Sequence, residues 1–189
     1  MAPVRALEDQ ARRAMLLGSG IHRMRSPHTS APAPREAGFD VVVASPAAVS
    51  ALRQTLDRPP MGVDGANVVL AMECNDAADD ERLAGAIREA GPIRSWRCSG
   101  ASALGPASLH ALLDRAADST SMQSLEIAGD AVGADSMDHL VDAVTRCTSL
   151  TALAIRRATW KLRSPPVPLF VALRDHPHMA SLTIEASRL

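Results

Sequence analysis

The sequence predicts an α/β solenoid, in which helices line the outside of a curved parallel sheet. Two patterns indicate this fold: an apolar strand signature returns at a nearly constant interval, and between the strands the apolar period changes from two residues to about 3.6. Aromatic residues make up only 2% of the 189 residues, which leaves Leu, Ile, Val, Met and Ala to build thin, regular layers. One strand and one helix cannot bury their apolar face alone, so such units must stack.

Six short strands are predicted from the repeated signature. Four segments align without gaps, with starts 29, 28 and 29 residues apart: 93–98, 122–127, 150–155 and 179–184. The same apolar-x-apolar pair recurs upstream at Leu70 and Met72 and, less distinctly, at Val41 and Val43. Each strand alternates in and out over its last residues. We therefore expect one ladder of stacked inward side chains on neighbouring strands: Trp96, Leu125, Leu153 and Leu182.

Helices are predicted between the strands. Apolar residues at helical spacing form stripes at 83–90, 109–116, 137–144 and 169–173, and segment 47–56 fits an earlier helix. Asp79 and Asp80 precede the first stripe and Gly91 follows it, while Pro106 opens the second and Asp135 precedes the third. These residue types are typical of helix ends.

A doubly wound α/β domain is the alternative fold, because it also alternates strands and helices. Its loops vary in length, whereas the units of this chain return every 26 to 29 residues. The regular spacing favours the solenoid.

Residues 1–37 are predicted to be a flexible tail rich in Arg, Ser and Pro, and residues 38–189 a solenoid of about five to six repeats. Within the tail, the apolar residues of segment 4–15 fit a brief amphipathic helix ending at Gly18. This segment is open to three interpretations: a marginal helix, a docking segment, or part of an export signal.

Charge and cysteine content exclude some partners. The net charge of −1 provides no field to attract nucleic acid or anionic lipid, and no apolar run approaches the roughly 20 residues of a membrane span. The odd number of cysteines, Cys74, Cys98 and Cys147, fits reduced thiols. We expect a soluble protein of a reducing, cytoplasmic compartment with a protein as its partner.

The repeat resembles ribonuclease-inhibitor-like leucine-rich repeats from about residue 38 onward. The resemblance rests on the 28 to 29 residue period, the L-x-x-L-x-L-like strands and the helix motifs at 83–87 and 109–113. The asparagine that this family places at the ninth repeat position occurs only as Asn75, and the equivalent residues are Ala101, Asp130 and Ala158. Other groups, such as Ser side chains or water, must then satisfy the loop backbones.

The resemblance implies a non-enzymatic scaffold that binds other macromolecules through its concave strand face, with no cofactor. The Ala- and Arg-rich composition and the Ser/Pro/Arg-rich leader also look like type III secreted bacterial effectors, which would place the protein inside a host cell.

Side chains beside the inward pairs are predicted to face a partner. The proposed partner-binding residues are Arg97, Ser124, Glu126, Arg156, Thr183, Glu185 and Trp160. Arg97 and Arg156 are the best single candidates, because interface anchors are usually Trp, Tyr or Arg. An ordinary solvated sheet face is an equally good interpretation of this surface. Trp160 either anchors a partner at the rim or covers the turn beneath it.

No catalytic or metal motif stands out. No base accompanies a cysteine, and His176 and His178 supply only two ligands where a closed metal site needs four. The alternative function is a small α/β enzyme with a site at the carboxyl ends of the strands near Asn75, Asp76 and Asp130.

The last predicted strand has no following helix to cover it, since only five residues follow Ile184. An open strand edge invites pairing with another chain, so we expect either a homodimer through this edge or a frayed end.

Overall fold

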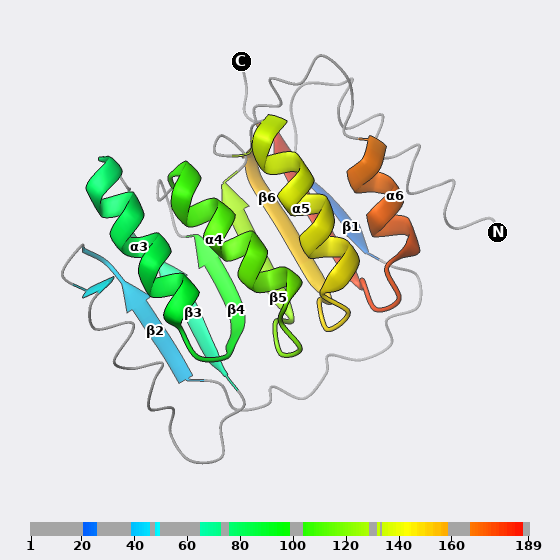
Figure 1. The fold of residues 1–189 in the computed structure, drawn as a ribbon. Coiled ribbons are helices and arrows are strands. Elements are labelled where there is room, and N and C mark those ends of the chain that lie inside the picture. The colour runs from blue at the N-terminus through cyan, green and yellow to red at the C-terminus, as the bar shows by residue number, and fades with distance from the viewer. Residues whose placement is uncertain are drawn as a thin grey trace.

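The computed structural model describes residues 21–25, 39–45, 48–49, 65–72, 76–98, 104–128, 132, 134–158 and 167–186. They form an α/β fold with one seven-stranded sheet in the order β1-β7-β6-β5-β4-β3-β2. Figure 1 shows the four helices of these ranges in one layer over one face of the sheet. The elements are β1 (Ile21–Arg25), β2 (Phe39–Val43), β3 (Ala66–Leu70), α3 (Ala77–Glu89), β4 (Ile93–Cys98), α4 (Pro106–Ala117), β5 (Ser124–Ala128), α5 (Ala134–Arg146), β6 (Ala152–Ala158), α6 (Val167–Asp175) and β7 (Ser181–Ala186).

Strands β2 to β7 are parallel, and each of β3 to β7 pairs with the strand that precedes it in the chain. A helix connects each of the last four strand pairs, which is the connection that parallel neighbours require. The predicted alternation of strands and helices is confirmed for this part of the chain.

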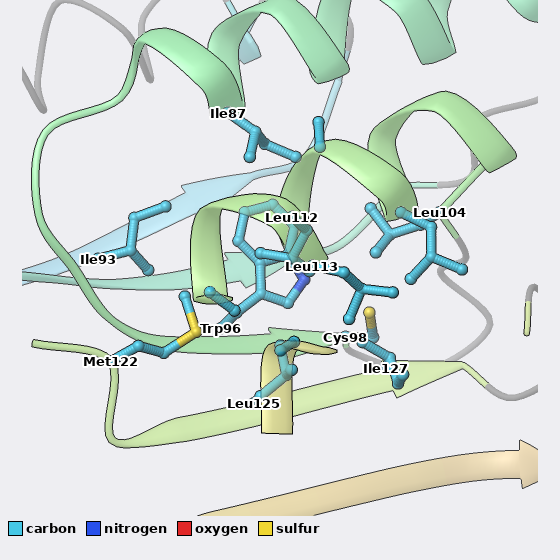
Figure 2. Close-up of a cluster of buried hydrophobic side chains, with 14 of the residues drawn as sticks. Ile87, Ile93, Trp96, Cys98, Leu104, Leu112, Leu113, Met122, Leu125 and Ile127 are labelled. Carbon is cyan, nitrogen blue, oxygen red and sulfur yellow. The ribbon is translucent and has the colours of Figure 1, made fainter. Parts of the chain in front are cut away.

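Two ranks of inward side chains run across the parallel strands. The pairing register places Trp96 opposite Leu125, Leu125 opposite Leu153, and Leu153 opposite Leu182. All four side chains are buried, as is the second rank: Val43, Leu70, Cys98, Ile127, Ile155 and Ile184. In Figure 2, Trp96 lies between β4 and the residues Leu112 and Leu113 of α4. The predicted neighbours therefore do lie side by side and close the core against the helices.

The strand register predicted from Leu70 and Met72 is wrong, although both side chains are buried in the core as expected. The register aligns Val68 with Trp96 and Leu70 with Cys98, so the pair of β3 is Val68 and Leu70. A shift of two residues keeps every side chain on its own face, so the apolar alternation alone cannot distinguish the two registers.

The helices begin close to the predicted residues. Pro106 occupies the first turn of α4, as predicted, whereas the N-cap of α3 is Asp76, whose side chain accepts a hydrogen bond from the N–H of Asp79 at 2.7 Å. Of the early helix expected at 47–56, Ala48 and Val49 are helical and the rest lies outside the described residues.

Asp80 caps the helix of the next unit. Its carboxylate accepts hydrogen bonds from the backbone N–H groups of Ala107 and Ser108, both at 2.9 Å, at the start of α4. Gly105, the N-cap of α4, supplies no side chain for this purpose. A Cβ atom at Gly105 would overlap the Asp80 carboxylate, so the glycine leaves room for a cap supplied by α3.

The helix-to-strand loops are also bonded from one unit to the next. The hydroxyl of Ser121 donates to the carbonyl of Ile93, and that of Ser149 to the carbonyl of Met122 at 2.9 Å. Serine side chains thus satisfy carbonyls of the helix-to-strand loops. Asn75 and Ala101 themselves lie outside the described residues.

Strand β1 corrects two expectations. Residues 21–25 were expected within a flexible tail, and β7 was expected to have an open edge, but β1 pairs antiparallel with β7 from Ile21 opposite Glu185 to Arg25 opposite Ser181. Backbone pairing orders this short segment, whose composition alone gives little sign of a strand. The edge that was expected to hold a homodimer is therefore occupied by the chain itself.

Removing an inward side chain from a central strand should destabilise the fold strongly. We expect Leu125→Ala or Leu153→Ala to lower the free energy of unfolding by about 2–5 kcal/mol, because each leaves a cavity in the core. Urea denaturation measures the loss. Val42→Ala, at a position that is 58% exposed, is the control and should cost less than about 0.5 kcal/mol. Equal losses at Leu125 and Val42 would contradict the assigned core.

Losing the cap between α3 and α4 should also destabilise the fold. Asp80→Ala should cost about 1–3 kcal/mol, since two buried N–H groups lose a charged acceptor. Gly105→Ala should destabilise the native chain but cost clearly less in the Asp80→Ala background, where the overlapping carboxylate is gone. The exposed Asp138 provides the control variant, Asp138→Ala. Additive effects of Asp80→Ala and Gly105→Ala would argue against this contact.

Candidate functional site

The face of the sheet opposite the helices carries the candidate site. Strand side chains alternate between the two faces, so residues next to the buried pairs lie on the side away from the helix layer (Figure 1). We call this side the open face. On β2 to β7 its residues are Asp40, Val42, Asn67, Val69, Ser95, Arg97, Ser124, Glu126, Ala152, Ala154, Arg156, Ser181, Thr183 and Glu185.

Six of the seven predicted partner-binding residues lie on the open face. Ser124 is in register with Ala152 and Ser181, and Glu126 with Ala154 and Thr183. Trp160 lies outside the described residues. The expected small-residue floor is present in β5, β6 and β7, where the Ser, Ala and Thr side chains are half-buried.

The four longest side chains of the open face form one charged network across four neighbouring strands. Arg156 of β6 donates from Nε to Oε1 of Glu126 at 2.7 Å and from a terminal nitrogen to Oε1 of Glu185 at 3.0 Å. On the other side of Glu126, Nε of Arg97 lies 3.9 Å from Oε2. The charges alternate from β4 to β7, so the network is neutral as a whole. We call these four residues the charged network.

Glu126 is the centre of the charged network. Its side chain is only 10% exposed, against 45% for Arg156 and 66% for Arg97. A carboxylate this deeply buried needs a hydrogen-bonded cation, and Arg156 supplies two nitrogens to it. The hydrogen bond to Glu126 is the main reason why the pKa of Arg156 is raised above its ordinary value.

Strand β6 is irregular beside Arg156, in its pairing with β7. Ile155 pairs with Ile184 and Ala158 with Ala186, so Arg156 and Arg157 together oppose the single residue Glu185. Arg157 has a φ of 53°, in the left-handed region that side chains other than glycine rarely adopt. Arg156 reaches diagonally back to Glu126, whose direct partner in β6 is Ala154, a side chain too small to obstruct it.

Two arginines that the sequence presents as equivalent anchors therefore differ. Arg156 is bound to two carboxylates, whereas the contact between Arg97 and Glu126 is too long for a hydrogen bond. Arg156 stays a predicted partner-binding residue, but its guanidinium already binds two carboxylates of the sheet. The signal was present in the sequence, because the network residues 97, 126, 156 and 185 are 29, 30 and 29 positions apart with alternating charge. The interval of 30 reflects the diagonal contact, because Arg156 lies two residues beyond Ala154, the direct partner of Glu126.

The described residues offer little reactive chemistry. Burial raises the pKa of the Cys98 thiol to about 11, which disfavours the thiolate that a nucleophile requires. Cys147 is buried as well, and Cys74 lies outside the described residues. The Nδ1 atom of His176 accepts from the N–H of His178, while Nε2 donates to the carbonyl of Cys147 at 2.9 Å, so both ring nitrogens have structural roles. Within the described ranges no three His, Cys, Asp or Glu side chains are grouped to hold a metal ion.

Of the residues suggested for an enzyme site, Asp76 acts as the N-cap of α3, and Asn75 and Asp130 lie outside the described residues. Asp76 therefore has a structural task at the strand end where the alternative function placed a catalytic group.

A groove between α5 and α6 was not predicted. It has a volume of about 520 Å³ and is lined by Val141, Thr145, Val167, Pro168, Val171, Ala172, Asp175, His176 and Pro177. Val141 belongs to the apolar stripe predicted for α5, but it is only half-buried, and α6 buries only Leu169 completely. The helical pattern identifies which residues are apolar without showing how closely two helices approach.

No protein-family model, no curated protein and no solved structure matches the chain. Among the described helices, none has the length and apolar content that a membrane crossing needs.

The two arginines of the charged network should respond differently to substitution. Arg156→Met should lower the free energy of unfolding by about 1–3 kcal/mol, because Glu126 keeps a buried charge without its partner. Arg97→Met should change it by less than about 0.5 kcal/mol. Glu126→Gln added to Arg156→Met should recover part of the loss. Thermal and urea unfolding measure these changes, and similar losses at both arginines would refute the assigned difference.

Proposed function

We propose that the chain is a short leucine-rich-repeat solenoid of the ribonuclease-inhibitor-like kind, and that it is a non-enzymatic scaffold binding a protein partner through the open face. The strand order supports the solenoid, since β2 to β7 follow one another in the sheet as they do in the chain. Equivalent buried residues recur at intervals of 27 to 29, from Val41 to Val68 and onward to Leu182.

The position of the helices argues against the doubly wound alternative. Doubly wound domains cover both faces of their sheet with helices. In this chain α3, α4, α5 and α6 lie over the same face (Figure 1). Successive helices also contact one another, as the outer elements of stacked units do.

The observation that carries the proposed function is the sheet surface that none of the described helices covers, with the charged network across it. An ordinary solvated face needs no carboxylate that is 10% exposed and bound by an arginine from the next strand. Such fixed charges favour complementary partners and oppose others, so they contribute specificity. Small side chains beside them, such as Ser124 and Ala154, leave room for a partner's side chains.

The proposal does not extend to where the protein acts. Delivery into a host cell as a bacterial effector rests on composition and on residues 1–37, and it stays a prediction. The cytoplasmic compartment also stays a prediction.

A matched pair of charge reversals tests the proposed function. Arg97 on the open face and Arg82 on α3 have side chains that are 66% and 67% exposed, so Arg97→Glu and Arg82→Glu change the same charge at equal exposure. Immobilised wild-type and variant chains would capture proteins from cell extracts, with quantitative mass spectrometry as the readout. We expect at least one protein to bind the wild type and Arg82→Glu about tenfold more than Arg97→Glu.

Both variants should unfold at nearly the wild-type temperature, which confirms that lost binding reflects the surface and not the fold. The proposed function fails if every captured protein binds Arg97→Glu and Arg82→Glu equally.

A further inference from the structure

We infer that the recognition element of the open face is its β2–β4 corner, formed by Val42, Val69 and Arg97, and that it binds a polypeptide segment carrying a carboxylate beside aliphatic side chains. This inference rests on the proposed function and specifies the partner's chemistry. The register places Val42 opposite Val69 and Val69 opposite Arg97, so the three residues form one row across three neighbouring strands. We call this row the corner.

Exposed apolar surface marks the corner. Val42 is 58% exposed, and the only other large hydrophobic side chains of the described residues with comparable exposure are Val167 and Val171 on α6. Val69 beside it is half-buried. Two neighbouring valines on a strand face that no described helix covers are the kind of apolar centre that a partner's aliphatic side chain can bury.

Arg97 gives the corner its charge preference. Its guanidinium lies 3.9 Å from Glu126, and that carboxylate is already bound by Arg156 at 2.7 Å. The planar guanidinium of Arg97 therefore retains donors for a carboxylate from outside, which it can bind with two parallel hydrogen bonds. Arg156 has no comparable capacity, because Glu126 and Glu185 occupy it.

Asp40 sets the orientation of the bound segment. It lies on β2 one step before Val42 on the same face, and its Oδ1 accepts a hydrogen bond from Nδ2 of Asn67 at 3.0 Å. A carboxylate near Asp40 would be repelled. The segment is therefore oriented with its carboxylate at Arg97, its aliphatic side chains over Val69 and Val42, and no negative charge over Asp40.

Selection of peptides tests this chemistry even though the natural partner is unidentified. A phage-displayed library of short random peptides would be selected on the immobilised full chain. We expect the enriched peptides to combine Asp or Glu with nearby Leu, Ile or Val. Enriched peptides without acidic residues, or no enrichment above that seen with the Arg97→Glu chain, would overturn the inference.

Synthetic copies of the enriched peptides then locate the site. In fluorescence polarisation, Arg97→Glu should weaken binding by about tenfold or more and Val42→Ser several-fold, while Arg82→Glu should leave it unchanged. Replacing the peptide's acidic residue by Lys should restore binding to Arg97→Glu. Binding that is equal for wild type and Arg97→Glu overturns the inference.

Failure of the corner is distinguishable from failure of the proposed function. If peptides or captured proteins are lost on Arg156→Met/Glu126→Gln but not on Arg97→Glu or Val42→Ser, the open face binds a partner elsewhere than at the corner. If none of these open-face variants changes any binding, the proposed function fails as well.

Discussion

Burial of two inward side chains per strand is the constraint on which this structure depends. A single strand cannot bury the rank that contains Trp96, Leu125 and Leu153. These side chains are buried only where helices and neighbouring strands enclose them. The spacing of 27 to 29 residues keeps these side chains in register across the sheet. Polar groups reinforce the same arrangement, because Asp80 caps the following helix and Ser149 bonds the preceding loop. Each unit therefore needs its neighbours both for its apolar core and for its backbone hydrogen bonds.

The open face is charged but largely self-neutralised. Glu126 is stabilised by Arg156 in the folded state, through hydrogen bonds from two nitrogens of its guanidinium. The guanidinium of Arg156 is then largely occupied by carboxylates of the sheet itself. The consequence is a division of the surface: the β5–β7 part is committed to its own ion pairs, whereas the β2–β4 part has exposed valine and an arginine with unused donors.

Much of the fold could be predicted from the sequence, because periodicity reports burial directly. The strands around Trp96, Leu125 and Leu153 and the helix opened by Pro106 follow from it. The register of β3 could not be predicted, since a shift of two residues leaves the alternation unchanged. The pairing of Arg156 with Glu126 is diagonal between neighbouring strands, and it shows in the sequence only as an interval of 30 in place of the 28 that separates directly paired residues. Strand β1 forms by pairing with β7, which is distant in the sequence. The composition of residues 21–25 alone does not indicate this pairing.

The pairing of β1 with β7 has a consequence for biosynthesis. On the ribosome Ile21–Arg25 is made before any of the strands β2 to β6, yet its partner Ser181–Ala186 emerges after all of them. The parallel strands and their helices can assemble from contacts between successive units, which form quickly, whereas this antiparallel pair must close a loop that contains nearly the whole domain. Of the described strands, the first to be translated is therefore expected to pair last, and until then its backbone and the growing edge of the sheet stay open to contact with other chains.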